Sequence, residues 1–349
     1  MKKYILTVIQ LLITAGLLWW IFRNPDQNQK LLAALKTANL WWFLPGLVAI
    51  GAGVLIQVER WLLLLRVQGI VVSFSRALRI VLVGMFFNLF LIGATGGDIV
   101  KIFLIIREAP LKKAGALLSV FIDRIVGLLA LAVISAVMIL CHWDALISHD
   151  FTRLVVITVA IILGGSLGFI LVAWLVDRLH LTTRLPQWLP ARAKIVEAAS
   201  AFAEYARSGK SVTYAFLLSL PAHFLFFSTF YFGAKAFSAG LDLSNLFCVS
   251  PIVSTVTALP ISVGGAGLRE ALFIKILGGL YSTPESIATL ISLSGFMMTV
   301  FWSLVGGAIY LLYRSSNHDL PHMADMQGAV ETLEHQVEAN AASGHKLDS

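Results

Sequence analysis

Charged side chains beside glycine-rich interruptions are the residues of this sequence best suited to bind an ion. The stretch Ala258–Phe273, ALPISVGGAGLREALF, places Pro260, three glycines and the adjacent pair Arg269 and Glu270 within a long apolar run. Proline removes a backbone donor and glycine loosens a helix, so this stretch does not fit an uninterrupted membrane-spanning helix. An ionisable residue inside a membrane segment indicates a functional site. The alternative, a glycine-rich surface loop, is disfavoured by the apolar segments on both sides.

A second interruption of the same kind lies in the first half of the chain. The segment Leu78–Ile106 reads LRIVLVGMFFNLFLI, then GATGGD, then IVKIFLII. After each interruption we expect a short helix, beginning near Asp98 or near Leu268, whose N-terminus offers backbone N–H groups and the positive end of the helix dipole. With Lys101 and Arg269 in the first turns, these two helix ends predict a site for a phosphate.

Acidic residues accompany the basic ones, and we expect four neighbouring pairs: Asp98 with Lys101, Asp123 with Arg124, Glu59 with Arg60, and Glu270 with Arg269. Two interpretations stay open. The carboxylates orient the bases around a bound head group, or the ion pairs only hold the helices together, with Asp98 as a helix cap. Burial of an idle arginine at the depth of the second interruption costs at least about 2.5 kcal/mol, which favours ligand binding there.

The candidate substrate-binding residues are those at the two interruptions and one acid–base pair between them. They are Gly96, Gly97, Asp98, Lys101, Asp123, Arg124, Gly264, Gly265, Gly267, Arg269 and Glu270.

The composition is that of an integral membrane protein. Of 349 residues, 58% are hydrophobic and 13% charged, with a mean hydropathy of +0.85, whereas soluble domains have about 25% charged residues. The formal net charge of +7 is interpreted as cytoplasmic loop Lys and Arg facing anionic lipid, and not as a nucleic-acid site. We expect an all-α protein with six full spans, near Tyr4–Phe22, Leu40–Leu65, Gly115–Leu140, Leu154–Val176, Val212–Phe232 and Ile287–Tyr313.

The distribution of basic residues predicts how the interrupted segments enter the membrane. Arg107, Lys112 and Lys113 lie on the same side as Arg76 and Arg79 only if the first segment turns back at its break. By the same rule the second segment, Leu246–Leu280, enters from the opposite side and returns there. Two units with matching broken segments in inverted orientation are typical of a transporter whose binding site lies at the breaks. We expect one membrane domain, residues 1–314, a flexible cytoplasmic tail, 315–349, and both termini in the cytoplasm.

Enzyme motifs do not occur in the sequence. It has no GxSxG, no HExxH, no Cys/His cluster at metal spacing and no nucleotide-binding strand–turn–helix. We therefore predict no catalytic residues, no metal and no cofactor. His223 lies alone in a predicted span, where hydrogen bonding to a neighbour is more common than a proton relay.

Three segments in order, FNLFLIGATGGDIVKIFLI, FIDRIVGLLAL and ALPISVGGAGLREALF, resemble the lysylphosphatidylglycerol synthase transmembrane family, the flippase-like domain of the multiple peptide resistance factors. The resemblance covers about Tyr4–Arg314. It implies a protein of a bacterial-type cytoplasmic membrane that moves a lipid across the bilayer, with paired re-entrant helices around a central cavity. It marks Gly96–Asp98, Lys101, Asp123–Arg124 and Gly264–Glu270.

Two departures from the family qualify this expectation. Relatives often have arginine where this chain has Lys101, which cannot bind a phosphate in bidentate fashion. Full-length synthases continue into a soluble aminoacyl-transfer domain, whereas this sequence ends in a short tail, so we expect transport without lysine transfer.

The preferred hypothesis is a flippase or transporter for a phospholipid or lipid-linked head group. One alternative is a membrane-embedded transferase that uses Asp98 or Glu270 as a base. Another is a non-catalytic partner of a separate synthase, docked through the loop 186–210. A homo-oligomer is also open.

Overall fold

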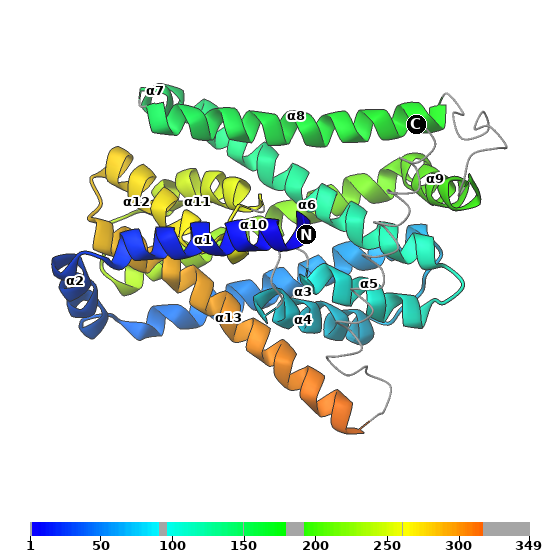
Figure 1. Cartoon of the computed structure of the whole chain (residues 1–349), viewed down its shortest axis with the longest axis horizontal. Helices are drawn as coiled ribbons and strands as arrows, with labels where there is room; N and C mark the ends of the chain where they lie inside the picture. Colours follow the sequence, from blue (N-terminus) through cyan, green and yellow to red (C-terminus); the bar gives the residue numbers. More distant parts are fainter. Residues whose placement is uncertain (1, 91–95, 149, 179–191, 260, 317–349) are drawn as a thin grey trace.

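The structure is a computed structural model that describes residues 2–90, 96–148, 150–178, 192–259 and 261–316, and every regular element in these ranges is a helix (Figure 1). Within them, five helical segments are long and apolar enough to cross a membrane. They comprise α3 (Phe43–Val67), α6 (Lys113–Cys141), α8 (Asp150–Arg178), α10 (Gly209–Ala236) and α13 (Glu285–Ser316). These helices match five of the six predicted spans, and the chain is a multi-pass membrane protein.

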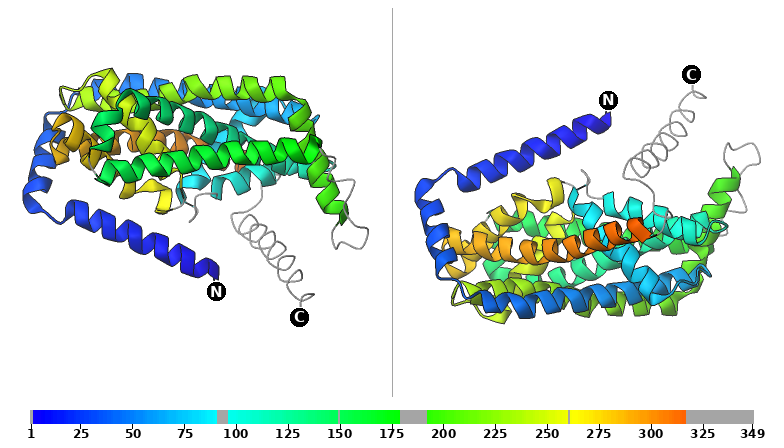
Figure 2. Two further views of the ribbon diagram at one scale, coloured as in Figure 1. Left: turned by 90° about the horizontal axis from the view of Figure 1, so that it is seen from above. Right: turned by 90° about the horizontal axis from the view of Figure 1, so that it is seen from below.

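The first predicted span corresponds to α1 (Lys2–Phe22), a helix of 21 residues. In the views of Figure 2, α1 lies along one side of the bundle. It packs against α2 (Pro25–Lys36), which runs across one end of the bundle, and against the second interruption. The predicted tail lies outside the described residues from position 317 onward.

Four shorter helices form two pairs at the predicted interruptions. The first pair is α4 (Phe74–Phe90) and α5 (Gly96–Glu108), and the second is α11 (Leu243–Thr257) and α12 (Leu268–Tyr281). They contain 17, 13, 15 and 14 residues. At about 1.5 Å per residue, each helix is shorter than the roughly 30 Å hydrocarbon core. No single one of them therefore crosses the core by itself.

The two helix pairs lie toward opposite ends of the long axis (Figure 1). We divide these helices into two units: α3, the α4–α5 pair and α6 form the first, and α10, the α11–α12 pair and α13 form the second. The first spans of the units, α3 and α10, pack against each other, α4 packs on α13, and α11 packs on α6. Each short pair is thus held by the last span of the other unit, which is the arrangement that a two-fold relation between the units produces.

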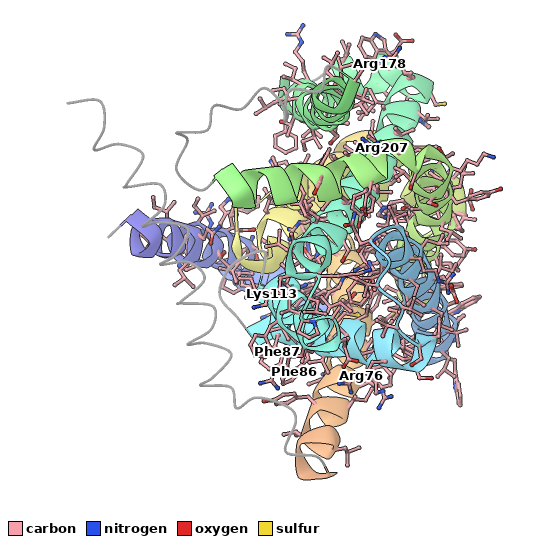
Figure 3. All side chains as sticks on the ribbon, turned by 90° about the vertical axis from the view of Figure 1, so that its right-hand side faces the viewer. Arg76, Phe86, Phe87, Lys113, Arg178 and Arg207 are labelled. Carbon is pink, nitrogen blue, oxygen red and sulfur yellow. The ribbon has the colours of Figure 1, made fainter. Side chains whose placement is uncertain are left out.

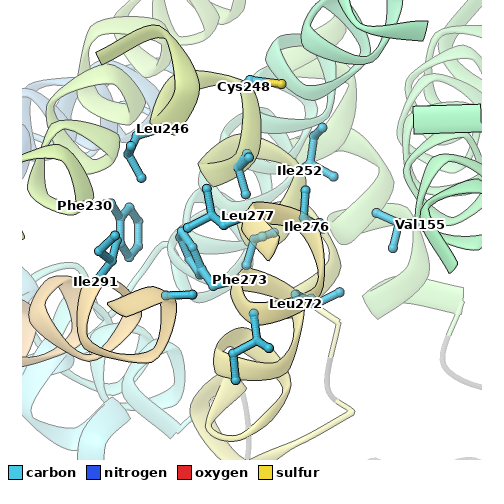
Figure 4. Packing of buried hydrophobic residues seen from close by; sticks show 14 of the residues in the cluster. Val155, Phe230, Leu246, Cys248, Ile252, Leu272, Phe273, Ile276, Leu277 and Ile291 are labelled. Carbon is cyan, nitrogen blue, oxygen red and sulfur yellow. The ribbon is translucent and has the colours of Figure 1, made fainter. Parts of the chain in front are cut away.

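The second helix pair is enclosed by an apolar core (Figure 4). Leu246 of α11 and Phe273 and Leu277 of α12 are fully buried among α10 and α13. The ring centroids of Phe230 and Phe273 lie 4.9 Å apart. Burial of these aromatic and leucine side chains stabilises the packing of the second helix pair.

At the opposite end, α9 (Arg192–Arg207) lies across the ends of α3 and α6. The hydroxyl of Tyr205 donates a hydrogen bond to the Leu64 carbonyl at 3.0 Å, and Gln68 Nε2 donates to the Ala201 carbonyl at 2.7 Å. Burial raises the pKa of the Tyr205 phenol, so this group stays protonated at neutral pH. The two hydrogen bonds join α9 to the helix that carries Arg60.

Candidate functional site

A cavity of about 310 Å³ lies between α3, α4, α5, α6 and α10. Asp123, on its wall, is ten residues after the start of α6 at Lys113, which places it roughly 15 Å along the helix. This is about half the thickness of a hydrocarbon core. Ala258, which caps the C-terminus of α11, also lines the cavity. The other lining residues are Gln57, Arg60, Val81, Gly84, Met85, Asn88, Asp98, Lys101, Arg124, Gly127, Leu128, Leu131 and His223.

An arginine from α3, Arg60, is buried in the wall of this cavity. Arg60 Nε donates to Asp123 Oδ1 at 2.8 Å, and its Nη1 donates to Ser219 Oγ of α10 at 2.9 Å. The side chains of Arg60 and Asp123 are only 5% and 6% exposed. A Cβ at Gly127 would lie 3.0 Å from Arg60 Nη1, so the glycine makes room for the guanidinium. The pair joins three membrane-spanning helices, and breaking a buried pair of this kind is strongly destabilising.

Lys101 of α5 approaches the same carboxylate from the other side. Its Nζ lies 3.6 Å from Asp123 Oδ2, beyond hydrogen-bonding distance, and 4.7 Å from the centroid of the Trp61 ring. Lys101 is 8% exposed. Within the described part of the chain its ammonium group has an ion pair and a cation–π contact but makes no hydrogen bond. None of its three N–H donors is used in a hydrogen bond there, so the ammonium group can donate to a ligand in the cavity.

A second ion pair lies nearer the cavity opening. Arg124 of α6 donates through Nη1 to Asp98 Oδ2 in the first turn of α5. The two side chains are 40% and 24% exposed, several times more than Arg60 and Asp123. This pair joins the tip of the first helix pair to a membrane-spanning helix at a place that solvent or a ligand can reach.

The predicted pairs Asp98–Lys101, Asp123–Arg124 and Glu59–Arg60 are therefore not the ones that form. Adjacent residues on a helix point about 100° apart, so Asp123 faces Arg60 while Arg124 faces Asp98. Glu59 is exposed on α3. Arg60 is the residue that sequence reasoning undervalued, because its partners come from two distant helices.

The N-terminus of α5 is less open to a phosphate than expected. Asn88 Oδ1 of α4 already accepts a hydrogen bond from Gly97 N–H at 2.8 Å. A Cβ at Gly97 would lie 2.1 Å from the Gly84 carbonyl oxygen, so the glycines let α4 and α5 approach each other closely. Gly96 and Gly97 are buried, and the small size of Gly97 serves this helix contact.

The predicted residues at the second interruption form a separate, closed cluster. Glu270, 1% exposed, accepts hydrogen bonds from Arg269 Nη2 at 2.7 Å, from Ser292 Oγ at 2.8 Å and from Gly267 N–H at 2.7 Å. The guanidinium of Arg269 also lies 4.8 Å from the centroid of the Phe296 ring. Arg269 and Glu270 do not line the cavity described above.

The glycines of the second interruption shape its backbone. Gly264, Gly265 and Gly267 have φ of 58°, 75° and 77°, a region in which glycine is favoured. The 3₁₀ turn η3 (Val263–Gly265) is covered by α1, because Thr14 Oγ1 accepts the Val263 N–H at 2.9 Å. A Cβ at Gly267 would lie 2.6 Å from Leu17 Cβ of α1.

His223 has the role expected for a lone histidine in a span. Its Nε2 lies 3.0 Å from the Gly127 carbonyl oxygen, which makes this nitrogen the donor. The ring stacks on Phe227. Although predicted to be only a hydrogen-bonded side chain, His223 also contributes to the cavity wall. Among the residues that the structure describes, no group of three or more His, Cys, Asp or Glu side chains is arranged to hold a metal ion.

Comparison with known proteins is consistent with this architecture. A family model described as the lysylphosphatidylglycerol synthase TM region matches residues 7–307. A curated relative, the UPF0104 membrane protein PH1989 of Pyrococcus horikoshii, is 29% identical over 165 residues, 47% of each chain. The matched region thus spans about half the length of that relative. Because the family match extends from α1 into α13 and includes both interruptions, the chain belongs to the lysylphosphatidylglycerol synthase transmembrane family.

Proposed function

We propose that this protein carries a lipid between the leaflets of the cytoplasmic membrane, with the polar head group in the cavity and the acyl tails in the bilayer. Its family links it to lipid modification or translocation at a membrane. The observation that carries the proposal is the cavity itself. Charged side chains from α3, α5 and α6 meet there at about half the membrane depth, where ionisable residues are rare and indicate a functional site.

The two helix pairs give this cavity a route toward each face. Asp98 and Lys101 stand at the tip of the α4–α5 pair, and Ala258 at the end of α11 reaches the same cavity. We propose that the pairs enter from opposite leaflets as re-entrant hairpins and that movement of either one opens the cavity to its own side. The exchanged packing of α4 on α13 and α11 on α6 supports this arrangement.

The binding groups in this proposal are Lys101 and Arg124, with Asp98 and Asp123 positioning them. Lys101 contributes unused donors, and Arg124 contributes a partly exposed guanidinium whose positive charge attracts the phosphate while it stays paired with Asp98. Arg269 and Glu270, which satisfy each other, instead hold α12 against α13.

The proposed orientation places the end shown in Figure 3 in the cytoplasm. Arg76, Lys113, Arg178 and Arg207 mark this face, and the base of the α4–α5 pair is closed there by Arg76 Nε donating to Glu108 Oε1 at 2.7 Å. An excess of Lys and Arg is typical of cytoplasmic loops.

Lipid movement in proteoliposomes tests the function. The full chain is reconstituted in vesicles that contain tail-labelled phospholipid, and the rate at which label reaches the outer leaflet is measured. We expect transfer above the protein-free rate and a fall of at least about tenfold in the double variant Lys101→Gln/Arg124→Gln, which corresponds to an increase of about 1.4 kcal/mol in the free-energy barrier to transfer. Lys113→Gln, an exposed change on the same helix α6, is the matched control. Equal rates in the double variant and the wild type would contradict this site.

A membrane-embedded transferase is the second candidate, favoured by the partly exposed carboxylate of Asp98 beside a cationic group. It predicts a lipid product of altered mass after incubation with a donor, and loss of that product in Asp98→Asn. Lipid movement without any change in mass would decide for transport.

A further inference from the structure

We propose that the cavity selects a phosphodiester lipid whose head-group alcohol is uncharged, and that Lys101 is the residue that makes this selection. This inference rests on the proposed function and deepens it by naming the chemical class of the substrate. It depends on the charge balance of the cavity and on the open hydrogen-bonding capacity of one ammonium group.

The lining residues carry one more positive charge than negative charges. Arg60, Lys101 and Arg124 are cationic, whereas only Asp98 and Asp123 are anionic. An uncompensated charge away from bulk water is unfavourable, so the cavity favours a ligand that brings one negative charge. A phosphodiester with a neutral alcohol brings that single charge.

The nearby segments do not alter this balance. Residues 91–95, between α4 and α5 in the sequence, are LIGAT, and position 260 is proline, so neither adds an ionisable side chain. His223 donates through Nε2 to the Gly127 carbonyl, as a neutral imidazole can. Glu59, next to Arg60 in sequence, is exposed on α3 and is not part of the cavity wall.

The excess charge resides on Lys101. Asp123 is already engaged by Arg60 at 2.8 Å, and Asp98 by Arg124. Lys101 shares Asp123 at 3.6 Å without a hydrogen bond, and the Trp61 ring covers part of the ammonium. A phosphate oxygen in the cavity would supply both the missing negative charge and the missing acceptor.

A zwitterionic lipid fits this site less well. Its ammonium group would bring back the positive charge that its phosphate had balanced. The two carboxylates that could accept it already bind arginine side chains. Discrimination therefore comes from charge repulsion around Lys101 as well as from attraction to the phosphate.

The test compares two lipids that differ only in the head group. The full-length protein is reconstituted in phosphatidylcholine vesicles with tail-labelled phosphatidylglycerol or phosphatidylethanolamine carrying the same chains, and both transfer rates and equilibrium binding are measured. For the wild type we expect phosphatidylglycerol to be favoured by at least about tenfold. In Lys101→Gln this ratio falls toward one, and in Lys101→Arg it is retained. Lys113→Gln, which removes a surface charge from α6, leaves the ratio unchanged.

The ratio of phosphatidylglycerol to phosphatidylethanolamine transfer tests this inference separately from the proposed function. Transfer of both lipids at equal rates, or an unchanged ratio in Lys101→Gln, overturns the selection by Lys101 while transport stands. Absence of any transfer overturns transport, and the binding ratio still decides the selectivity. Inorganic phosphate is added as a competitor, and inhibition at concentrations as low as those of dispersed phosphatidylglycerol would assign the site to free phosphate and overturn the lipid assignment.

Discussion

The tips of the two short helix pairs both carry an acid and a base, but they use them in opposite ways. At the α11–α12 tip, Glu270 accepts from a guanidinium, a hydroxyl and a backbone N–H and is fully buried. At the α4–α5 tip, Asp98 lies in a partly exposed ion pair and Lys101 has no hydrogen bond in the described part of the chain. The two units share a packing pattern, yet Asp98 and Lys101 line the cavity described above whereas Arg269 and Glu270 do not.

This difference assigns separate tasks to the two units. A closed cluster contributes stability and specifies how α12 sits against α13, because its buried carboxylate is hydrogen-bonded to a guanidinium, a hydroxyl and a backbone N–H. An open cluster contributes less stability, because its charges remain available to bind a ligand. The comparison therefore predicts that substitutions at the second tip change stability and that substitutions at the first tip change ligand binding.

The largest expected effect on stability is at Glu270. In Glu270→Ala, Arg269 would remain buried without its carboxylate and Gly267 N–H would lose its acceptor, a loss of about 3–5 kcal/mol for a broken buried pair. Thermal unfolding of the purified protein in detergent measures this loss of stability. Glu59→Ala, an exposed acid on α3, is the control and should leave the unfolding temperature almost unchanged. A small loss in Glu270→Ala would mean that the second tip is as open as the first.

A smaller effect is expected where α4 and α5 touch. In Gly97→Ala the new methyl group would lie 2.1 Å from the Gly84 carbonyl oxygen and 2.6 Å from Asn88 Cγ, which forces the two helices apart. Overpacking of this kind costs about 1–3 kcal/mol. Because Lys101 lies on α5, lipid binding should weaken together with stability. Binding that stays normal while stability falls would show that the spacing of α4 and α5 does not position Lys101.

At the second tip, a glycine-to-alanine substitution is expected to destabilise the protein through backbone strain and not through a clash. Gly264 has free space around it but a φ of 58°, so Gly264→Ala adds conformational strain of about 1–2 kcal/mol without a clash. Lipid transfer should keep its wild-type head-group preference, since Gly264 does not line the cavity that contains Lys101. Gly164→Ala, in a helix with open space and an ordinary φ, is the control. A changed head-group preference in Gly264→Ala would connect the second tip to the binding site.

Whether a feature of this structure could be predicted from the sequence depends on how far apart in the chain its interacting residues lie. The interruptions, the spans and the short helices depend on local composition, and α12 begins at Leu268 as predicted. The ion pairs of the cavity depend on helices far apart in the chain. Arg60 and Asp123 are 63 residues apart, and Ser219 is another 96 residues further on. Only the adjacent pair Arg269–Glu270 was predicted correctly, because a flexible arginine can fold back onto its neighbour.

The smallest expected effect on stability is the most informative for the comparison. In Asp98→Asn the ion pair with Arg124 is lost, but both side chains are partly exposed, so the free energy of unfolding should fall by less than about 1 kcal/mol. The same change removes one negative charge from the cavity, and binding of an anionic lipid should therefore become tighter by a few fold. Thermal unfolding and lipid binding are measured on one preparation, with Asp98→Glu as the variant that keeps the charge. Loss of several kcal/mol in Asp98→Asn would make the first tip a structural cluster like the second. Tighter binding at nearly constant stability would assign the first tip to ligand binding and the second to structure. A charge that affects ligand affinity but not folding belongs to a binding site.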